Sequence, residues 1–216
     1  MNVYRRVLES VTELLRDNKD VPNKTIVFDL DDTLVNSRSS SPGHVPFIGW
    51  VEFYDRIPEM VELLKRAKTM GYNIIIITAR PPQTEFVALE NLKEKIPEIV
   101  PLVDTIYASP IPLSGDIEKF KQFKAILRRN LEQIDLKSAK LLTSWDLYNL
   151  ELHKNFPKKD RLNIVLTIGD QPYDLSEMSN FGVLLPRPER PNIAYLYQRR
   201  YIKNENQYTE VCLNSI

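Results

Sequence analysis

Residues 26 to 35, IVFDLDDTLV, decide the fold class because an apolar run changes abruptly into a group of acidic residues. Thr25 to Phe28 is short, apolar and rich in β-branched side chains, which is typical of a strand buried on both faces. Asp29, Asp31 and Asp32 follow at once. This stretch therefore predicts a buried strand with carboxylates at its carboxyl end.

Two later stretches repeat this pattern of an apolar run followed by polar residues. Ile74 to Ile77 is an unbroken run of isoleucine that ends at Thr78, and Leu162 to Ile168 ends at Gly169 and Asp170. Helical patterns separate the runs, which indicates a doubly wound parallel α/β sheet. Ligands bind beyond the carboxyl ends of the strands in such sheets, so Asp29, Asp31, Thr78 and Asp170 should meet on one rim.

The rest of the chain fits a single domain over residues 1–216. Residues 1–22 carry apolar residues at helical spacing, and Pro58 begins another helix that Gly71 closes. Helices are also expected near 83–95, 117–131 and 145–156, with a weaker strand at 104–108. Residues 36–57 form a short cap loop, residues 132–161 a loosely patterned insertion, and residues 186–216 a tail rich in Pro, Arg and Tyr.

Composition narrows the class of protein. Basic and acidic residues balance at 29 each, so net charge does not favour nucleic acid or an anionic membrane as the partner. Cys212 is the single cysteine, and no stretch approaches the ~20 apolar residues of a membrane helix. The charged N-terminal segment lacks the apolar centre of a signal peptide. The expected location is cytoplasmic.

The acidic residues on the rim suit phosphoryl transfer. Asp29 can attack phosphorus as a carboxylate, and Asp31 can protonate the leaving oxygen and then activate water. Backbone amides in the turn through Asp32 and Thr33 can cradle phosphate oxygens. Asp29 and Asp170 offer the hard oxygen ligands that Mg²⁺ prefers.

These residues resemble the motifs of the haloacid dehalogenase superfamily. The stretch 26–35 resembles its first motif, Thr78 its second, and IGDQPYDL at 168–175 its acidic fourth motif. Thr78-Ala79-Arg80 and the fourth motif are most similar to the class B and plant acid phosphatase-like branch. Asp31 favours phosphate esters, since dehalogenases of the superfamily lack its equivalent.

The resemblance implies three sets of site residues. The catalytic set is Asp29, Asp31, Thr78 and Lys124. The substrate-binding set is Asp32, Thr33, Ala79 and Arg80. The Mg²⁺ ligands are drawn from Asp29, Asp31, Asp170 and Asp174, with Asp174 as an orienting residue or an alternative ligand.

The lysine of the third motif has several candidates. Lys119, Lys121 and Lys124 lie in the expected helix, and Lys124 is preferred because Leu127 and Leu131 follow it at +3 and +7. The alternatives nearer to the fourth motif are Lys154, Lys158 and Lys159.

The short segment between the first two motifs predicts an open rim, edged by residues 36–50 and by residues 132–161, which could instead form a lid. The leading hypothesis is a phosphomonoesterase of small or nucleotide-like substrates, with modest discrimination among them. The alternatives are a polynucleotide-end or phosphoprotein phosphatase and a non-catalytic phosphate-binding scaffold. Four arginines near the C-terminus motivate the polynucleotide alternative: Arg187, Arg190, Arg199 and Arg200.

Overall fold

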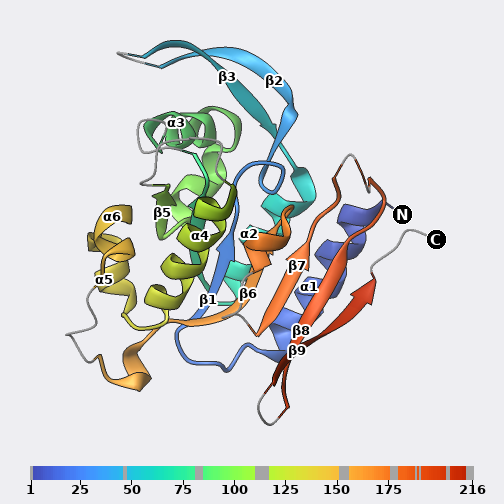
Figure 1. The fold of residues 1–216 in the computed structure, drawn as a ribbon. Helices are drawn as coiled ribbons and strands as arrows, with labels where there is room; N and C mark the ends of the chain where they lie inside the picture. Colours follow the sequence, from blue (N-terminus) through green and yellow to red (C-terminus); the bar gives the residue numbers. More distant parts are fainter. Residues whose placement is uncertain are drawn as a thin grey trace.

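The computed structural model describes residues 2–45, 48–80, 85–109, 117–150, 156–175, 180–187, 189, 191–202 and 205–212. Its centre is a seven-stranded sheet in the order β5-β4-β1-β6-β7-β8-β9 (Figure 1). The strands of this sheet are β1 (Lys24–Phe28), β4 (Asn73–Thr78), β5 (Thr105–Ala108), β6 (Asn163–Gly169), β7 (Phe181–Leu184), β8 (Tyr195–Ile202) and β9 (Glu205–Cys212).

The strand order creates a switch point beside β1. The pairs β1·β4, β4·β5, β1·β6 and β6·β7 are all parallel. The chain thus builds outward from β1 through β4 to β5, then returns to the other side of β1 with β6 and β7. Open parallel sheets bind ligands where the strand order reverses in this way. The predicted doubly wound α/β fold is confirmed, and Asp29 follows β1, the strand at the switch point.

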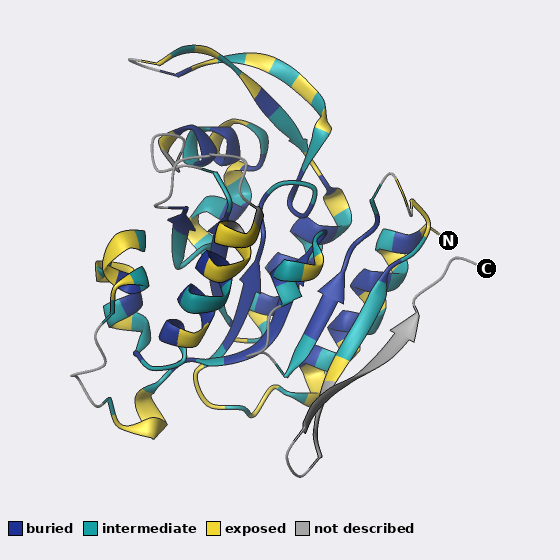
Figure 2. Ribbon diagram, in the orientation of Figure 1, coloured by how far each residue is buried: buried dark blue, intermediate teal, exposed yellow. Residues whose placement is uncertain are grey.

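Helices cover both faces of the sheet and bury most of it (Figure 2). The helices are α1 (Val3–Asp17), α2 (Pro58–Thr69), α3 (Glu85–Lys95), α4 (Ile117–Leu131), α5 (Leu136–Leu141) and α6 (Ser144–Tyr148), with 3₁₀ turns η2 (Pro97–Leu102), η3 (Lys158–Asp160) and η4 (Pro172–Leu175). Successive strand residues point to opposite faces. Accordingly Ile26 packs in the core with α1 and α2, whereas its neighbour Val27 packs in the core with α4 to α6.

The segment expected to be a cap loop is instead a two-stranded antiparallel ribbon, made of β2 (Val35–Val45) and β3 (Gly49–Arg56). It stands at the carboxyl end of the sheet (Figure 1). Among the described Ser, Pro and Gly residues that suggested a loop, Ser40 and Pro42 are exposed and the others are half-buried. A Cβ atom on Gly43 would lie 2.4 Å from the ring of Phe53. Asn91 of α3 anchors the ribbon, since its side-chain amide exchanges two 3.0 Å hydrogen bonds with the backbone of Tyr54.

Two other segments differ from the sequence prediction. The tail is ordered in part as β8 and β9, which extend the sheet by antiparallel pairing. The helix expected over 145–156 is the shorter α6, capped by Thr143 and ended at Asn149, and residues 151–155 lie outside the described residues. The 132–161 insertion is no lid in its described part, because Ala139 and Leu147 belong to the core packed on the sheet.

Candidate active site

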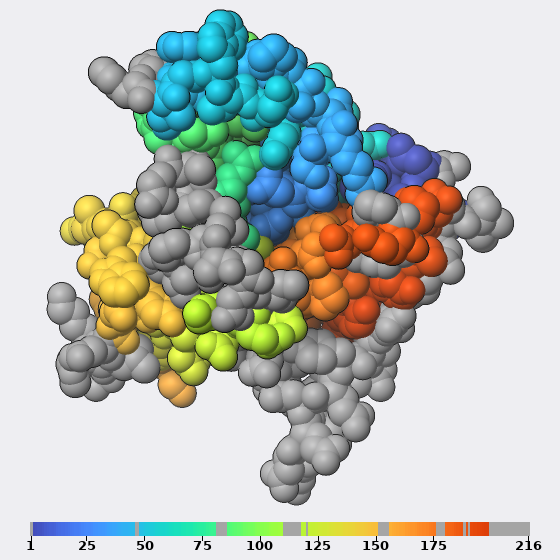
Figure 3. Space-filling view, turned by 45° about the horizontal axis from the view of Figure 1, so that its top comes forward, coloured from blue at the N-terminus to red at the C-terminus, as the bar shows by residue number. Residues whose placement is uncertain are grey.

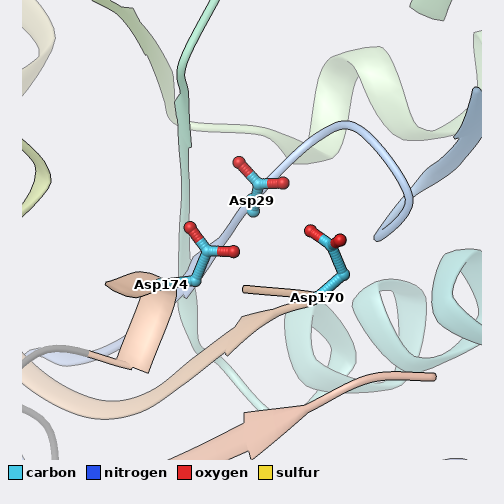
Figure 4. A group of neighbouring side chains, drawn as sticks. All are labelled: Asp29, Asp170 and Asp174. Carbon is cyan, nitrogen blue, oxygen red and sulfur yellow. The ribbon is translucent and has the colours of Figure 1, made fainter. Parts of the chain in front are cut away.

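Three carboxylates from separate segments meet at the carboxyl end of the sheet. Asp29 follows β1, Asp170 follows β6, and Asp174 lies in η4, one turn further on. Their side chains face the same small space in Figure 4. One oxygen of each lies within 4.8 Å of the others, and all three residues are buried. The backbone N–H of Asp29 donates to the carbonyl of Ile168 over 2.9 Å, and this bond joins the end of β1 to the end of β6.

Lys124 supplies the positive charge at the centre of this group. Its ammonium donates to Asp29 Oδ1 over 2.7 Å and also to Asp174 Oδ1, and Lys124 is only 1% exposed. Burial raises the pKa of Asp29 well above its usual range, and Lys124 opposes that rise. The paired carboxylates raise the pKa of Lys124 despite its burial, so this ammonium is charged at neutral pH.

The other candidate lysines lie elsewhere. Lys121 is exposed and pairs with Glu118 on its own helix, and Lys119 is exposed too. Lys158 and Lys159 lie in η3, before β6 begins, where the carbonyl of Lys159 accepts a hydrogen bond from Asn23 ahead of β1. These residues therefore lie where β1 and β6 begin, at the opposite end of the strands from Asp29. Lys154 lies outside the described residues.

Two residues near Lys124 were not singled out from the sequence. Arg128, one helical turn after Lys124, is fully buried, and its guanidinium donates to the carbonyl of Tyr173 over 3.1 Å. The ring of Tyr173 lies 5.4 Å from the Lys124 ammonium, within range of a cation–π contact. The signal available in the sequence was the i, i+4 spacing of two basic residues on a helix face that also carries Leu127 and Leu131.

Asp31 lies apart from the three buried carboxylates and has a partner of its own. Arg80 donates to it twice, from Nε over 2.9 Å and from Nη2 over 2.5 Å. The Arg80 guanidinium also lies 5.2 Å from the ring of Tyr54 on β3. The side chain expected to contact phosphate therefore holds the predicted proton-transfer residue. The expectation that the Asp31 carboxylate joins the metal ligands has no support in this geometry.

The turn after β1 is fixed by its own hydrogen bonds. Asp32 adopts a left-handed conformation with φ of 54°, and its carboxylate accepts bonds from the backbone and hydroxyl groups of Ser37. Asp32 thus ties the turn to the base of the ribbon. The backbone N–H of Thr33, expected to be free for phosphate, instead donates to the carbonyl of Leu30 over 3.3 Å.

Thr78, the last residue of β4, lies at the same end of the sheet. Thr78 is buried, and its hydroxyl oxygen accepts the backbone N–H of Arg80 over 3.2 Å. With that lone pair engaged, the hydroxyl proton remains the group that can donate to an incoming oxygen. Ala79 contributes the backbone between Thr78 and Arg80, with a half-buried side chain.

Asp170 has other partners than Asp29 and Asp174, which share Lys124. Arg187, just beyond β7, places Nε 3.0 Å from Asp170 Oδ2, and Gln171 donates to the same oxygen over 3.1 Å. Burial and the neighbouring Asp174 nevertheless raise the pKa of Asp170 to about 6, with Arg187 opposing the rise. Asp170 therefore binds a proton more readily than an ordinary aspartate.

This donor set fits a divalent cation. The three buried carboxylates bring one oxygen each to within 4.8 Å of one another, and carboxylate oxygens are the ligands that Mg²⁺ prefers. Asp29, Asp170 and Asp174 are the residues that would hold it.

No helix among the described residues is long and apolar enough to cross a membrane, and the cytoplasmic location stays a prediction.

Comparison with known families agrees with this site. Residues 24–114 match the family described as Polynucleotide kinase 3 phosphatase, whereas no curated protein matches the chain. The matched stretch contains Asp29, Asp31, Thr78 and Arg80, and the fold adds Lys124, Asp170 and Asp174 to the same site. The match and the fold support a phosphatase of the haloacid dehalogenase superfamily, but not the class B and plant acid phosphatase-like branch that the motifs suggested.

Proposed function

We propose that this protein is a Mg²⁺-dependent phosphatase that removes the 3′-phosphate from polynucleotide ends. One observation supports this proposal most. The stretch that matches a polynucleotide 3′-phosphatase family contains Asp29, the carboxylate with which Lys124 is ion-paired. The match favours this alternative over the small-ester hydrolase that the sequence placed first.

In the first step, an Asp29 oxygen attacks phosphorus and the bond from phosphorus to the 3′-oxygen breaks. Asp31 donates a proton to that leaving oxygen, which departs as an alcohol. Thr78 donates its hydroxyl proton to a phosphate oxygen, and Lys124 offsets the charge of Asp29 and Asp174. A Mg²⁺ ion bound to the carboxylates would neutralise charge on the phosphate oxygens.

In the second step, Asp31 takes a proton from a water molecule as that water attacks phosphorus. The acyl phosphate bond breaks, and Asp29 is restored as a carboxylate with release of inorganic phosphate. Asp31 is protonated again, so the cycle closes.

The pairing of Asp31 with Arg80 requires a rearrangement before the first step. Both carboxylate oxygens of Asp31 accept hydrogen bonds from the Arg80 guanidinium, so this contact must loosen before Asp31 can reach the leaving oxygen. An incoming phosphate competes for the same guanidinium. Transfer of Arg80 from Asp31 to the phosphate would then release Asp31 to carry a proton, so substrate binding itself would prepare the acid.

The neutral net charge does not oppose a nucleic-acid substrate in this architecture, because net charge averages over the whole surface. Three arginines, Arg38, Arg56 and Arg187, line one pocket beside the rim. Asp32 and Glu59 line the same pocket, so its lining has three basic and two acidic side chains. A local excess of this kind can contact a polyanion even when the net charge of the chain is zero.

The test compares phosphate release from matched substrates in the presence of Mg²⁺. A 3′-phosphorylated oligonucleotide should be hydrolysed faster than the 5′-phosphorylated isomer, the 3′-mononucleotide or a phosphoserine peptide. Asp29→Asn should abolish release without loss of fold, because the change is nearly isosteric and removes the attacking charge. Preference for the phosphoserine peptide, or full activity of Asp29→Asn, would sink the proposal.

A further inference from the structure

A pocket of about 350 Å³ opens beside the catalytic rim. Its lining comes from three parts of the chain: the start of α1, the base of the β2–β3 ribbon with the start of α2, and a third part that supplies Pro186, Arg187 and Pro191. In Figure 3 these segments come together on one face, next to the turn that follows β1. Asp32 and Arg187 connect the pocket to the catalytic site. Both line the pocket, while Asp32 lies in the acidic turn after β1 and Arg187 pairs with Asp170. A chain leaving the site on this side enters the pocket directly.

The charged groups of the pocket differ in what they already contact. Arg187 pairs with Asp170, and Arg56 pairs with Glu98 over 3.1 Å. By contrast, the exposed guanidinium of Arg38 makes no ion pair with any residue that the structure describes. Arg38 is the one of these three arginines whose guanidinium has no ion-pair partner among the described residues.

The acidic groups of the pocket are already hydrogen-bonded. Asp32 accepts bonds from Ser37, and Glu59 accepts a 2.8 Å bond from the side-chain amide of Asn2. Neither carboxylate is paired with Arg38. An anion at Arg38 therefore does not have to displace an existing ion pair.

The remaining walls suit a nucleotide. Tyr4 presents a half-buried ring, and three prolines, Pro58, Pro186 and Pro191, present apolar surface. Burial and the nearby Asp32 raise the pKa of Tyr4, so its hydroxyl remains a proton donor at neutral pH. Aromatic and apolar surface with a few polar groups is typical of small-ligand pockets of this size.

We propose that this pocket binds the nucleotide on the 5′ side of the 3′-terminal one, with the Arg38 guanidinium on its phosphodiester and Tyr4 against its sugar or base. This inference rests on the proposed function and deepens it. The Arg38 contact would separate a polynucleotide end from a 3′-mononucleotide, because a mononucleotide has no phosphodiester to offer.

The test measures binding without turnover. Fluorescence anisotropy in the Asp29→Asn background compares a labelled dinucleotide 3′-phosphate with the corresponding 3′-mononucleotide. Adding Arg38→Ala should weaken dinucleotide binding by about tenfold, as expected for losing one charge-assisted hydrogen bond, and mononucleotide binding by less than about twofold. The salt dependence of dinucleotide binding should fall by about one ion contact. Arg38→Lys should restore part of the affinity.

The matched control is Arg5→Ala, which removes the same charge from the exposed face of α1, where Arg5 pairs with Glu9. It should leave both affinities unchanged. The pocket assignment would be overturned if Arg38→Ala weakened the binding of both ligands equally or did not weaken dinucleotide binding. It would also be overturned if Arg5→Ala weakened dinucleotide binding as much as Arg38→Ala does. The proposed function fails by a separate result, namely no phosphate release from 3′-phosphorylated oligonucleotides by the wild-type protein.

Discussion

At the scale of single residues, the site depends on one buried ammonium that serves two buried carboxylates. Lys124→Ala would leave Asp29 and Asp174 without this partner, and breaking a buried ion pair typically costs about 3–5 kcal/mol of stability. The pKa of Asp29 is already raised by burial and would rise further without Lys124. We expect activity to fall at least about a thousandfold at neutral pH and to recover partly at higher pH.

The control for this change is Lys121→Ala on the same helix. Lys121 is exposed and pairs with Glu118, and exposed pairs contribute roughly 0–1 kcal/mol. Thermal unfolding and phosphate release, each measured across pH, separate loss of fold from loss of chemistry. Equal activity of the two variants would contradict the role given to Lys124.

Arg80 offers a second test at this scale. Arg80→Lys keeps the charge but cannot make the bidentate contact to Asp31. If Arg80 positions the proton donor, the first chemical step should slow by about a hundredfold for an alcohol leaving group. It should slow far less for p-nitrophenol, which departs without a proton. Rapid-quench measurement of alcohol or nitrophenol release checks this, and an equal loss for both substrates would place Arg80 on the phosphate alone.

At the scale of elements, the turn from β6 into η4 requires a glycine. A Cβ atom on Gly169 would lie 2.2 Å from Cβ of Asp174, so Gly169→Ala must displace the residue that contacts Lys124. Overpacking of this kind costs about 1–3 kcal/mol. We expect lower stability, weaker Mg²⁺ binding and a large loss of activity.

The matched control for the glycine is Gly182→Ala on the neighbouring strand β7. Its added Cβ would lie 3.3 Å from Leu175, a close contact that small shifts relieve. Isothermal titration with Mg²⁺ and thermal unfolding compare the two variants. Unchanged Mg²⁺ affinity in Gly169→Ala would show that Asp174 is not a ligand.

The elements also show what the sequence could and could not predict. The buried strands ending at Phe28, Thr78 and Gly169 could be predicted from their apolar runs, because a strand covered on both faces has no polar face. The preference for Lys124 followed from helix register, and the structure places this ammonium on Asp29.

Residues 36–49 were expected to be a loop because they are rich in Ser, Pro and Gly. The pairing of β2 with β3 is cross-strand, which residue-by-residue propensity does not reveal. The pairing of Arg80 with Asp31 joins residues 49 positions apart, a contact that only the assembled fold defines.

At the scale of the whole molecule, the acidic site should make stability depend on pH and on Mg²⁺. Burial raises the pKa of Asp170 from an ordinary value near 4 to about 6, so between these pH values the folded state binds more protons than the unfolded state. The free energy of unfolding of the metal-free protein should therefore fall as pH rises through that window. A divalent ion that binds only the folded state should reverse the loss, by about 2.7 kcal/mol at a hundred times its Kd.

The stabilisation by Mg²⁺ should be larger at pH 7 than at pH 5, because at pH 5 the ion must displace a proton from Asp170. Asp170→Asn removes the titrating group while keeping its size. In this variant we expect a flatter pH dependence without metal and little shift in Tm with Mg²⁺. Thermal unfolding at both pH values, with and without Mg²⁺ at constant ionic strength, measures all of these effects. Equal Mg²⁺ shifts at the two pH values, or an undiminished shift in Asp170→Asn, would mean that the ion acts elsewhere on the protein, because the proposed ligands are the groups whose protonation competes with it.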